Sequence, residues 1–274
     1  MSVLVIAEVG STWNWMANQK KNLEMGMHAI DMAADAGANV VKFQWTSNPV
    51  KMAERRRIQV PSAYHELNWP KEWHQKFYEY AQRVGIEYAC TVYVPEDVEV
   101  IDPYVQRYKI ASLEALARDM WDAVRQKDRQ TKKPILCSTG TMDLSDYNNA
   151  YSLIPFGADV SFLHCVAAYP APVEDMNLFC LHIEKADIPF EGLSDHSGHL
   201  LTGALAVAAG ASVVEVHMRV DRTPKDNPDY PHSHSPARLK QYISNIHLAE
   251  AMMGDGFKKV TQSEVAMAQH RVMV

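Results

Sequence analysis

Short apolar, β-branched runs alternate with helix-forming segments along almost the whole chain. This alternation predicts βαβ units and a parallel sheet, because parallel strands need a long crossover connection that a helix usually supplies. Each run is short enough to be a buried strand and is bounded by polar or glycine-containing turns. The eight predicted strands are residues 2–8, 39–44, 86–93, 105–112, 133–141, 158–166, 188–196 and 211–217.

The segments between these runs carry apolar residues at helical spacing. In the first segment Leu23, Met27 and Ile30 fall on one face, and Gly37 supplies a helix stop. The predicted helices are residues 19–36, 73–84, 95–104, 113–127, 143–156, 177–185, 198–208 and 236–252.

Eight strand–helix units in about 250 residues predict a closed (β/α)₈ barrel, an α/β fold also called the TIM barrel. An open doubly wound sheet is the alternative, but the first strand–helix connection lacks the glycine pattern of dinucleotide-binding folds. We expect the barrel domain to span residues 1–254, with an insertion at 45–71. A loop of this length is usually a functional lid or disordered, and Tyr64 and Trp69 favour an ordered one. Residues 255–274 form a C-terminal tail.

Composition excludes several partners. The net charge is −6, so no overall basic field favours nucleic acid or an anionic membrane. No apolar run approaches the roughly 18 residues of a transmembrane helix. The four cysteines form no CxxC pair, which suits free thiols in a reducing compartment and predicts a cytoplasmic protein. The triplet Arg55–Arg57 is predicted to be a solvated loop, with an anion clamp as the alternative.

Polar side chains end nearly every predicted strand, where a barrel of this type carries its chemistry. Two of them are lysines, which have no structural reason to be buried without a partner. A structural ion pair explains either lysine alone, but two at one mouth favour an anionic ligand. The strand-end set is Glu8, Lys42, Gln44, Thr91, Lys109, Ser112, Glu114, Ser138, Thr139, His164, Ser194, Asp195, His196, Glu215 and His217.

Two imidazoles, His196 and His217, follow neighbouring predicted strands. Such a pair can hold one divalent metal ion, although each could also be an ordinary hydrogen-bonded histidine. The hydroxyls of Ser112, Ser138 and Ser194 lie beside turns and could cradle a phosphate group or simply cap helices. The mouth is therefore predicted to hold a phosphorylated anion beside a divalent cation. A Ser–His–Asp triad is not favoured by this arrangement.

A series of short motifs occurs in order along the chain. They are IAEVG (6–10) with Asn14, VKFQ (41–44), KIASLE (109–114), STG (138–140), HCVAAYP (164–170), Asn177-Leu178, GLSDH (192–196), EVH (215–217) and Pro228-Asp229. Together they resemble the catalytic domain of the sialic acid synthase family, the N-acetylneuraminate synthase-like enzymes, from about residue 3 to residue 271.

The resemblance implies a cytoplasmic transferase of carbohydrate biosynthesis. Such an enzyme condenses phosphoenolpyruvate with an N-acylated amino sugar, or a related aldose, to give a sialic-type (nonulosonic) 2-keto sugar acid and phosphate. In this chemistry a metal polarises the sugar carbonyl, C3 of phosphoenolpyruvate attacks it, and water adds at C2. A homodimer is the oligomer that the resemblance suggests.

The resemblance also assigns residues. The metal, Mn²⁺ first and Mg²⁺ or Co²⁺ as alternatives, matches His196 and His217. Phosphoenolpyruvate contacts match Lys42, Lys109, Ser112, Ser138, Asn177 and Ser194. Sugar contacts match Gln44, Thr91, Tyr169 and Asp229, and the expected catalytic set is Glu8, Lys109, Glu114, His196, His217 and Asp229.

Three features depart from the family. We expect no C-terminal antifreeze-like domain, because residues 255–274 end where its linker would begin, and this leaves the acceptor sugar and the swapped dimer open. Only Thr91 is kept from the family's Ser-Thr-Pro-Phe motif. His232 and His234 are extra histidines, predicted to be solvated loop residues, with metal ligation as the alternative.

Two other functions stay open from the residues alone. One is a metal-dependent lyase or hydrolase on the same barrel, and the other is a non-catalytic sugar- or phosphate-binding protein. The combination of Glu8, Lys109, His196 and His217 weighs against a binding module, which has no reason to keep all four.

Overall fold

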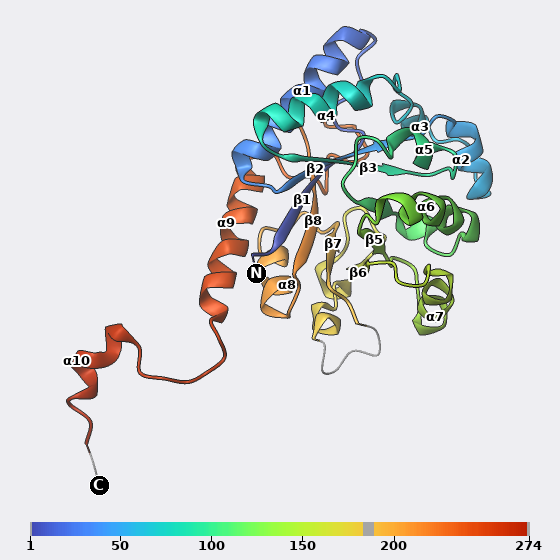
Figure 1. Ribbon diagram of the computed structural model, residues 1–274. Helices are drawn as coiled ribbons and strands as arrows, with labels where there is room; N and C mark the ends of the chain where they lie inside the picture. The colour runs from blue at the N-terminus through green and yellow to red at the C-terminus, as the bar shows by residue number, and fades with distance from the viewer. Residues whose placement is uncertain (1, 183–188, 273–274) are drawn as a thin grey trace.

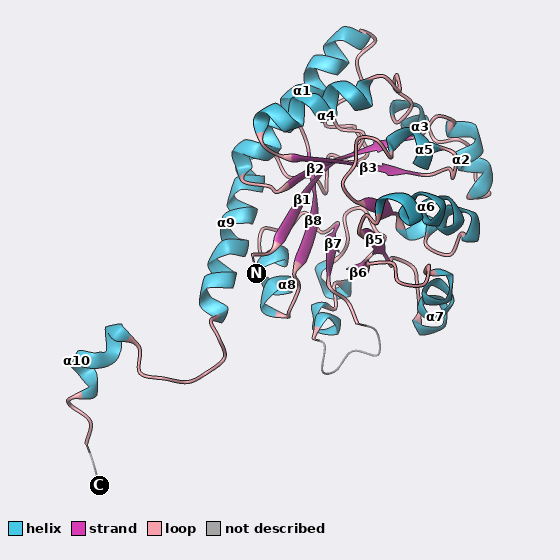
Figure 2. Ribbon diagram, viewed as in Figure 1, coloured by secondary structure: helices cyan, strands magenta, loops and turns pink. Residues whose placement is uncertain are grey.

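The computed structural model describes residues 2–182 and 189–272, and its eight parallel strands curve into a barrel with helices on the outside (Figures 1 and 2). The predicted α/β TIM barrel is thus confirmed. The strands are β1 Leu4–Val9, β2 Val40–Trp45, β3 Glu87–Val92, β4 Tyr108–Ile110, β5 Ile135–Ser138, β6 Val160–Cys165, β7 Gly192–Asp195 and β8 Val213–Met218.

The hydrogen-bonded order is β3-β2-β1-β8-β7-β6-β5-β4. β1 and β8, the first and last strands of the chain, are therefore neighbours, as a closed barrel requires. β3 and β4 lie next to each other, but among the described strands no ladder joins them. The barrel is consequently closed by packing at that one seam.

Helices cover the outer face of the strands. α1 shows how the sequence sets their ends: the Asn18 side chain accepts a hydrogen bond from the Lys21 N–H, and Gly37 ends the helix with a φ of 93°. The helices outside the insertion and the C-terminal tail are α1 Gln19–Ala36, α4 Trp73–Val84, α5 Asp97–Ile101, α6 Arg118–Thr131, α7 Leu144–Leu153, α8 Thr202–Ala208 and α9 Pro236–Met253.

Two predicted helices begin later than expected. The one placed at 113–127 starts at Arg118, after a 3-10 turn, η1 Ser112–Glu114, where the Ser112 hydroxyl accepts a hydrogen bond from the Gly140 N–H at 3.0 Å. The one placed at 198–208 starts at Thr202, because the Ser197 hydroxyl first accepts the His199 N–H at 3.1 Å. Side-chain bonds to backbone compete with helix formation in this way.

The predicted helix at 177–185 is wrong in its described part, which is the 3-10 helix η3 Leu178–Leu181. Its residues 183–185 lie outside the described residues, as does residue 188 of the seventh predicted strand. A second 3-10 helix, η2 Val173–Asp175, precedes it in the same connection.

The insertion at 45–71 is ordered and contains two helices, α2 Pro49–Arg55 and α3 Ser62–Glu66. Asn48 caps α2 by accepting the Lys51 N–H at 2.9 Å, and Pro49 takes the first helical position, where its missing N–H costs nothing. The Trp45 indole donates to the carbonyl oxygen of Trp69 at 2.8 Å and ties the end of the insertion to β2.

An apolar floor fills the lower part of the barrel. Each strand of the floor contributes one apolar side chain that points into the barrel. The residue two positions later on the same strand also points inward, and it is polar or carries sulfur. Gly192 pairs with Val213 at this level. A Cβ at position 192 would lie 2.2 Å from the carbonyl oxygen of Val213, so only glycine fits there. The floor consists of Ile6, Val40, Ala89, Leu136, Leu163 and Val213, and the level above it includes Glu8, Lys42, Thr91, Ser138, Cys165 and Glu215.

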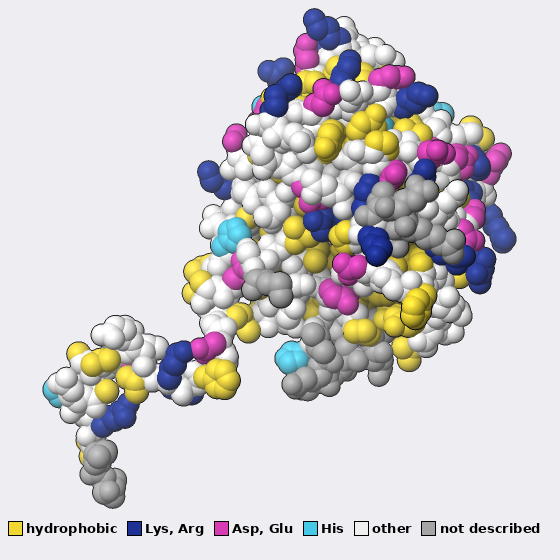
Figure 3. Space-filling model, viewed as in Figure 1, with side chains coloured by type: hydrophobic (Ala, Val, Ile, Leu, Met, Phe, Trp, Pro, Cys, Tyr) yellow, Lys and Arg dark blue, Asp and Glu magenta, His cyan; other side chains and the backbone are white. Residues whose placement is uncertain are grey.

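The chain beyond α9 runs away from the barrel (Figure 1). It contains η4 Gln262–Glu264 and α10 Val265–Ala268, and Phe257 and Met267 are among its exposed apolar side chains. Figure 3 shows apolar side chains on the surface of this segment. Within the described residues, no helix combines the length and apolar character needed to cross a membrane.

Candidate active site

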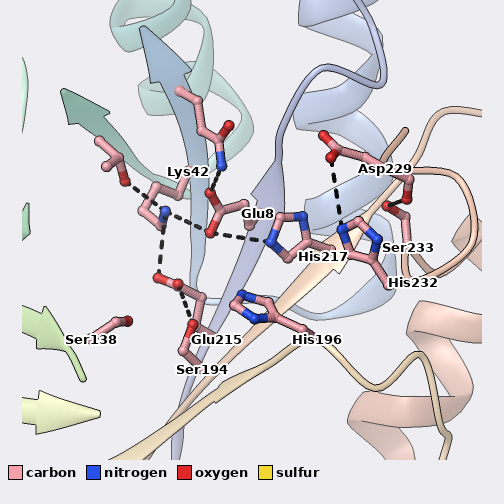
Figure 4. Close-up of polar contacts among 12 residues, drawn as sticks. Glu8, Lys42, Ser138, Ser194, His196, Glu215, His217, Asp229, His232 and Ser233 are labelled. Carbon is pink, nitrogen blue, oxygen red and sulfur yellow. Dashed lines mark hydrogen bonds and ion pairs between the residues drawn. The ribbon is translucent and has the colours of Figure 1, made fainter. Parts of the chain in front are cut away.

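The polar level above the floor is brought together by strand register. Glu8 on β1 pairs with Lys42 on β2 and with His217 on β8, and Ser194 on β7 pairs with Glu215 on β8. Because parallel neighbours in register point the same way, their side chains meet inside the barrel (Figure 4).

Two buried lysines share this interior with two carboxylates. Lys42 Nζ lies 2.7 Å from Glu8 Oε2, 2.7 Å from the Thr91 hydroxyl and 3.5 Å from Glu215 Oε2. Lys109 Nζ lies 3.4 Å from Glu215 Oε1 and donates to the Ser138 hydroxyl at 2.8 Å. The positive charges are thus held at the base of a cavity, each with at least one carboxylate partner.

The pKa values follow from this charge arrangement. Burial alone would raise the pKa of Glu8, but Lys42 and Lys109 outweigh it and hold the pKa at about 2. Burial would lower the pKa of Lys42, and Glu215 and Glu8 instead raise it. Both groups are therefore charged at neutral pH. Gln44 also donates its amide N–H to Glu8, which fixes the carboxylate further.

The two predicted metal ligands face each other at the same end of the barrel. The ring centroids of His196 and His217 are 5.2 Å apart. His196 Nδ1 lies 2.9 Å from the carbonyl oxygen of Val166, which leaves Nε2 to face the cavity. Nδ1 of His217 is buried without a hydrogen-bond partner, and its Nε2 lies 3.9 Å from Glu8 Oε2. The rings do not point apart.

The protonation of the pair differs between its members. Burial, followed by His232 and His196, lowers the pKa of His217 well below the usual value, so its ring is neutral and able to bind a metal ion. Burial lowers the pKa of His196 as well, but Cys165 and the Val166 carbonyl outweigh it and raise the pKa to about 9. A metal ion at Nε2 has to displace that proton.

Asp229 closes one side of the cavity from the loop after β8. Its Oδ2 accepts the Ser11 N–H at 2.7 Å and the Ser11 hydroxyl at 2.9 Å. A Cβ on Gly10 would lie 2.3 Å from the same oxygen, so only glycine permits this approach. Tyr169 also lines the cavity, with its ring centroid 4.4 Å from that of His196.

The cavity has a volume of about 420 Å³ and is open to solvent. It brings together most of the site residues predicted from sequence. Those that line it are Glu8, Lys42, Gln44, Thr91, Lys109, Ser112, Ser138, Tyr169, Ser194, His196, His217 and Asp229.

Two residues of the predicted catalytic and phosphoenolpyruvate-binding sets, Glu114 and Asn177, lie outside this lining, as does His164 of the strand-end set. The Glu114 carboxylate is held behind the wall by Arg56, whose Nε and Nη2 donate to Oε1 at 2.9 and 2.7 Å. Asn177 is in an exposed connection, with a φ of 39°, and is not among the lining residues. His164 points away and lies 2.8 Å from the carbonyl oxygen of Met176.

The insertion supplies lining residues that sequence reasoning did not assign. Met52, Arg56, Tyr64 and Leu67 form the wall on the side of α2 and α3. The prediction that Arg55–Arg57 is a solvated loop is wrong for Arg55, the last residue of α2, and for Arg56, which also donates to the Tyr64 hydroxyl at 2.6 Å. No local signal pointed to this role, because the partners Tyr64 and Glu114 lie 8 and 58 residues away in the sequence.

The prediction that His232 and His234 are solvated is also wrong. Their exposed fractions are 1% and 0%, because the loop after β8 folds back against the barrel. A backbone bridge between Met218 and His234 anchors this return, with the His234 N–H donating to the carbonyl oxygen of His217 at 2.9 Å.

No group of three or more His, Cys, Asp and Glu side chains in the described part of the chain is arranged, as it stands, to hold a metal ion. The two-histidine site therefore stays a prediction, supported by the orphaned His217 Nδ1 and by the orientation of His196.

Comparison with known proteins decides the family. The NeuB family model matches residues 29–258, which is most of the chain. This chain belongs to the NeuB family. It is 31% identical over 275 residues to the pseudaminic acid synthase of Campylobacter jejuni, covering 93% of this chain and 76% of that protein. It is 29% identical over 286 residues to the N,N'-diacetyllegionaminic acid synthase of Legionella pneumophila, covering 97% and 77%.

Solved structures agree with this assignment. The NeuB-family chain resembles the N-acetylneuraminic acid (sialic acid) synthetase of Leptospira borgpetersenii, whose structure is a complex with citrate, with a TM-score of 0.84 and 26% identity over 99% of this chain and 92% of that one. The relatives are synthases, and this chain is an enzyme of the same transferase type. The predicted family and enzyme class are confirmed.

Proposed function

We propose that this NeuB-family enzyme condenses phosphoenolpyruvate with an aldose of the N-acylated amino sugar class, giving a sialic-type 2-keto sugar acid and phosphate. The single observation that carries the proposal is the pairing of two buried lysines, Lys42 and Lys109, across Glu215 at the base of a cavity that also holds His196 and His217. A small, highly charged anion is the ligand that best suits two buried ammonium groups.

Each charged group has a role in binding phosphoenolpyruvate. Lys109 and the hydroxyls of Ser112, Ser138 and Ser194 would receive the phosphate or carboxylate oxygens, since all four line the cavity. Ser194 donates to Glu215 Oε1 at 2.9 Å, so this hydroxyl already has a fixed orientation. Preorganised donors of this kind stabilise charge without reorganising at the moment of reaction.

The bonds that change are as follows. C3 of phosphoenolpyruvate attacks the sugar carbonyl carbon, a C–C bond forms, and the carbonyl oxygen takes a proton. Water then adds at C2 and loses a proton, and the C2–O bond to phosphate breaks to leave the ketone. The sum is one phosphoenolpyruvate, one sugar and one water converted to one keto acid and one phosphate.

Glu8 suits the task of orienting water rather than deprotonating it outright. Its pKa of about 2 makes the carboxylate a weak base, and it already accepts hydrogen bonds from Lys42 and Gln44. Asp229 also lines the cavity, and among the described residues the hydrogen bonds to its carboxylate come from Ser11 alone, through Oδ2. Asp229 is the better candidate to accept a proton from a bound sugar or water.

His196 and His217 would hold a divalent ion. The His217 ring is neutral and the His196 ring would give up its proton on binding, and both are donors that suit Mn²⁺, Co²⁺ or Zn²⁺. Within the described residues, the buried Nδ1 of His217 has no hydrogen-bond partner. When bound, such an ion supplies Lewis-acid polarisation of a carbonyl oxygen. The Tyr169 ring packs against His196, with ring centroids 4.4 Å apart.

The test is phosphate release from phosphoenolpyruvate, measured with and without Mn²⁺ across a panel of N-acyl hexosamines. Release is expected only when an aldose is present, with phosphate and keto acid formed in equal amounts. Absence of release with every sugar, by protein that binds phosphoenolpyruvate, would contradict the proposal and favour a binding protein.

A further inference from the structure

Above the polar level, the cavity is lined differently on two sides. On the side of β7, β8 and the loop after β8, the lining residues His196, His217 and Asp229 are ionisable (Figure 4). On the side of β3, β4 and the insertion, most of the lining side chains are apolar or aromatic. We call this second side the apolar wall, and it consists of Met52, Tyr64, Leu67, Tyr93 and Ala111.

The strand order places these two sides across the barrel from each other. In the order β3-β2-β1-β8-β7-β6-β5-β4, with β3 packed beside β4, the pair β3 and β4 is half a turn from the pair β7 and β8. Each of these four strands leads to a cavity-lining residue two positions beyond the polar level. Those residues are Tyr93, Ala111, His196 and His217. A ligand that spans the cavity therefore meets imidazoles at one end and apolar surface at the other.

The apolar wall is preformed. Met52, Leu67 and Tyr93 pack together as a hydrophobic cluster separate from the core outside the strands and from the floor of the barrel. The carbonyl oxygen of Leu67 accepts the Thr46 N–H at 3.1 Å, which fixes the insertion to the end of β2. A ligand that contacts this surface does not have to order it first, so little of its binding free energy is lost.

The polar groups beside the apolar wall are already bonded to one another. Arg56 Nη1 donates to the Tyr64 hydroxyl at 2.6 Å, and Nε and Nη2 donate to Glu114 Oε1. The guanidinium carbon also lies 5.0 Å from the centroid of the Tyr93 ring. A sugar hydroxyl placed on this wall would have to compete with these contacts or lose the hydrogen bonds it makes in water, and either outcome is unfavourable.

We propose that the apolar wall is a subsite for a methyl group that the acceptor sugar carries, while the carbonyl end of the sugar lies at His196 and His217. The subsite rests on the proposed function for the presence of an acceptor sugar and goes beyond it in naming what that sugar presents to the wall. Burial of a methyl group against apolar side chains is favourable, whereas a hydroxymethyl group at the same place loses hydrogen bonds to water.

Two kinds of acceptor offer this methyl group. It is either the end of an N-acetyl substituent or a deoxy carbon at the end of the sugar chain. Both present the same chemistry to Met52, Leu67 and Tyr93, and replacing CH₃ by CH₂OH changes each of them by one hydroxyl. An apolar pocket rejects such an added hydroxyl by about 10- to 100-fold.

The experiment therefore compares two pairs of acceptors, each differing by that one hydroxyl. The parent is the N-acetyl hexosamine that supports the fastest phosphate release from phosphoenolpyruvate. It is paired with its N-glycolyl analogue and, separately, with its 6-deoxy analogue. The wild type is expected to show a kcat/KM about 10- to 100-fold higher for the methyl-bearing member of one pair, and that pair identifies the group that contacts the wall.

Met52→Gln tests whether the wall sets this preference, because it replaces a thioether by an amide of similar size. It is expected to lower the ratio of the two kcat/KM values about tenfold. Met120→Gln is the matched control, since Met120 is also 1% exposed but lies on α6 in the core outside the strands. It should keep the wild-type ratio. Both values in a ratio come from one preparation, so any loss of folded protein cancels, and Leu67→Asn replaces Met52→Gln if that variant yields no active enzyme.

Equal kcat/KM values within both pairs, or a preference for the hydroxylated members, would overturn the subsite and leave the proposed function intact, because phosphate would still be released with an aldose. A wild-type ratio in the wall variant, or an equal fall in Met120→Gln, would also overturn it. Absence of phosphate release with every aldose would overturn both.

Discussion

Lys42 and Glu8 form an ion pair, 2.7 Å from Nζ to Oε2, between adjacent strands inside the barrel, with the Lys42 side chain 2% exposed and the Glu8 side chain 4% exposed. Burying two charges carries a desolvation cost that their mutual attraction alone does not offset. The buried pair is stable because Thr91 and Glu215 also contact the ammonium group. A charge held at this cost is better explained by ligand binding than by stability.

Lys42→Met is expected to lower the free energy of unfolding by about 3 kcal/mol, because it leaves Glu8 and Glu215 buried together without their shared cation. Urea unfolding at neutral pH measures this. The double variant Lys42→Met, Glu8→Gln removes one of the two orphaned charges and is expected to recover part of the loss. Equal or greater loss in the double variant would show that the pair is not coupled in this way.

His217→Ala is expected to abolish metal binding and to lower phosphate release by more than about 100-fold, while the circular dichroism spectrum stays native. The reason is that His217 contributes one of the two predicted ligands and is itself neutral and orphaned at Nδ1. Normal turnover with metal-free variant protein would remove the metal from the mechanism.

Lys109→Met is expected to raise the dissociation constant for phosphoenolpyruvate about 10- to 100-fold, which is the loss of one charge-assisted contact. Isothermal titration or quenching of intrinsic fluorescence measures it. Lys51→Met is the matched control, because Lys51 forms an exposed ion pair with Glu96 on the outer surface. Unchanged affinity in Lys109→Met would exclude Lys109 from the anion site.

The fold and the central site could be predicted because they depend on local pattern. Ile6 and Glu8 lie two positions apart on one strand, as do Val40 and Lys42 on the next, so both members of each pair point into the barrel. An apolar residue followed two positions later by a charged one therefore predicts both the apolar floor and the polar level above it. The same alternation recurs on several strands, and the barrel topology then brings those strand ends together without further information.

Arg56 and His232 could not be placed by such reasoning, since their surroundings come from distant parts of the chain. Arg56 is buried by Glu114 and Tyr93, and His232 by strand β8 and Tyr169. Nothing within a few residues of either distinguishes it from a solvated loop residue. Helix starts at 118 and 202 were missed for a related reason, because Ser112 and Ser197 bond to backbone instead of continuing the helix.

Arg56→Met is expected to raise KM for the acceptor sugar and to speed proteolysis within residues 45–71. The guanidinium joins Glu114 to Tyr64 and lies 5.0 Å from the centroid of the Tyr93 ring, so its loss releases the wall that α2 and α3 form. Breaking this partly buried pair is expected to cost about 2 kcal/mol. Arg57→Ala, at the exposed end of the same triplet, is the control and should leave both properties unchanged.

Glu66, the last residue of α3, gives the enzyme a pH-dependent stability. Burial, then Asp229 and Asp226, raise the pKa of its carboxyl from 4.5 to about 7, and one carboxyl oxygen is buried without a partner. The unfolded chain therefore releases this proton near the unperturbed value of 4.5, while the folded chain keeps it until about 7. The contribution of Glu66 to the free energy of unfolding is complete below its unfolded pKa of 4.5 and is lost as the pH rises to its folded pKa of about 7.

Because the side chain is partly exposed, the loss is discounted to about 1 kcal/mol between roughly pH 4 and pH 8. Glu66→Gln, which cannot ionise, is expected to gain that amount relative to the wild type over the same range, measured by urea unfolding at both ends. Glu54→Gln, an exposed charge removal on the neighbouring helix α2, controls for net charge. If both variants changed with pH to the same extent, long-range charge rather than burial beside Asp226 and Asp229 would be the cause.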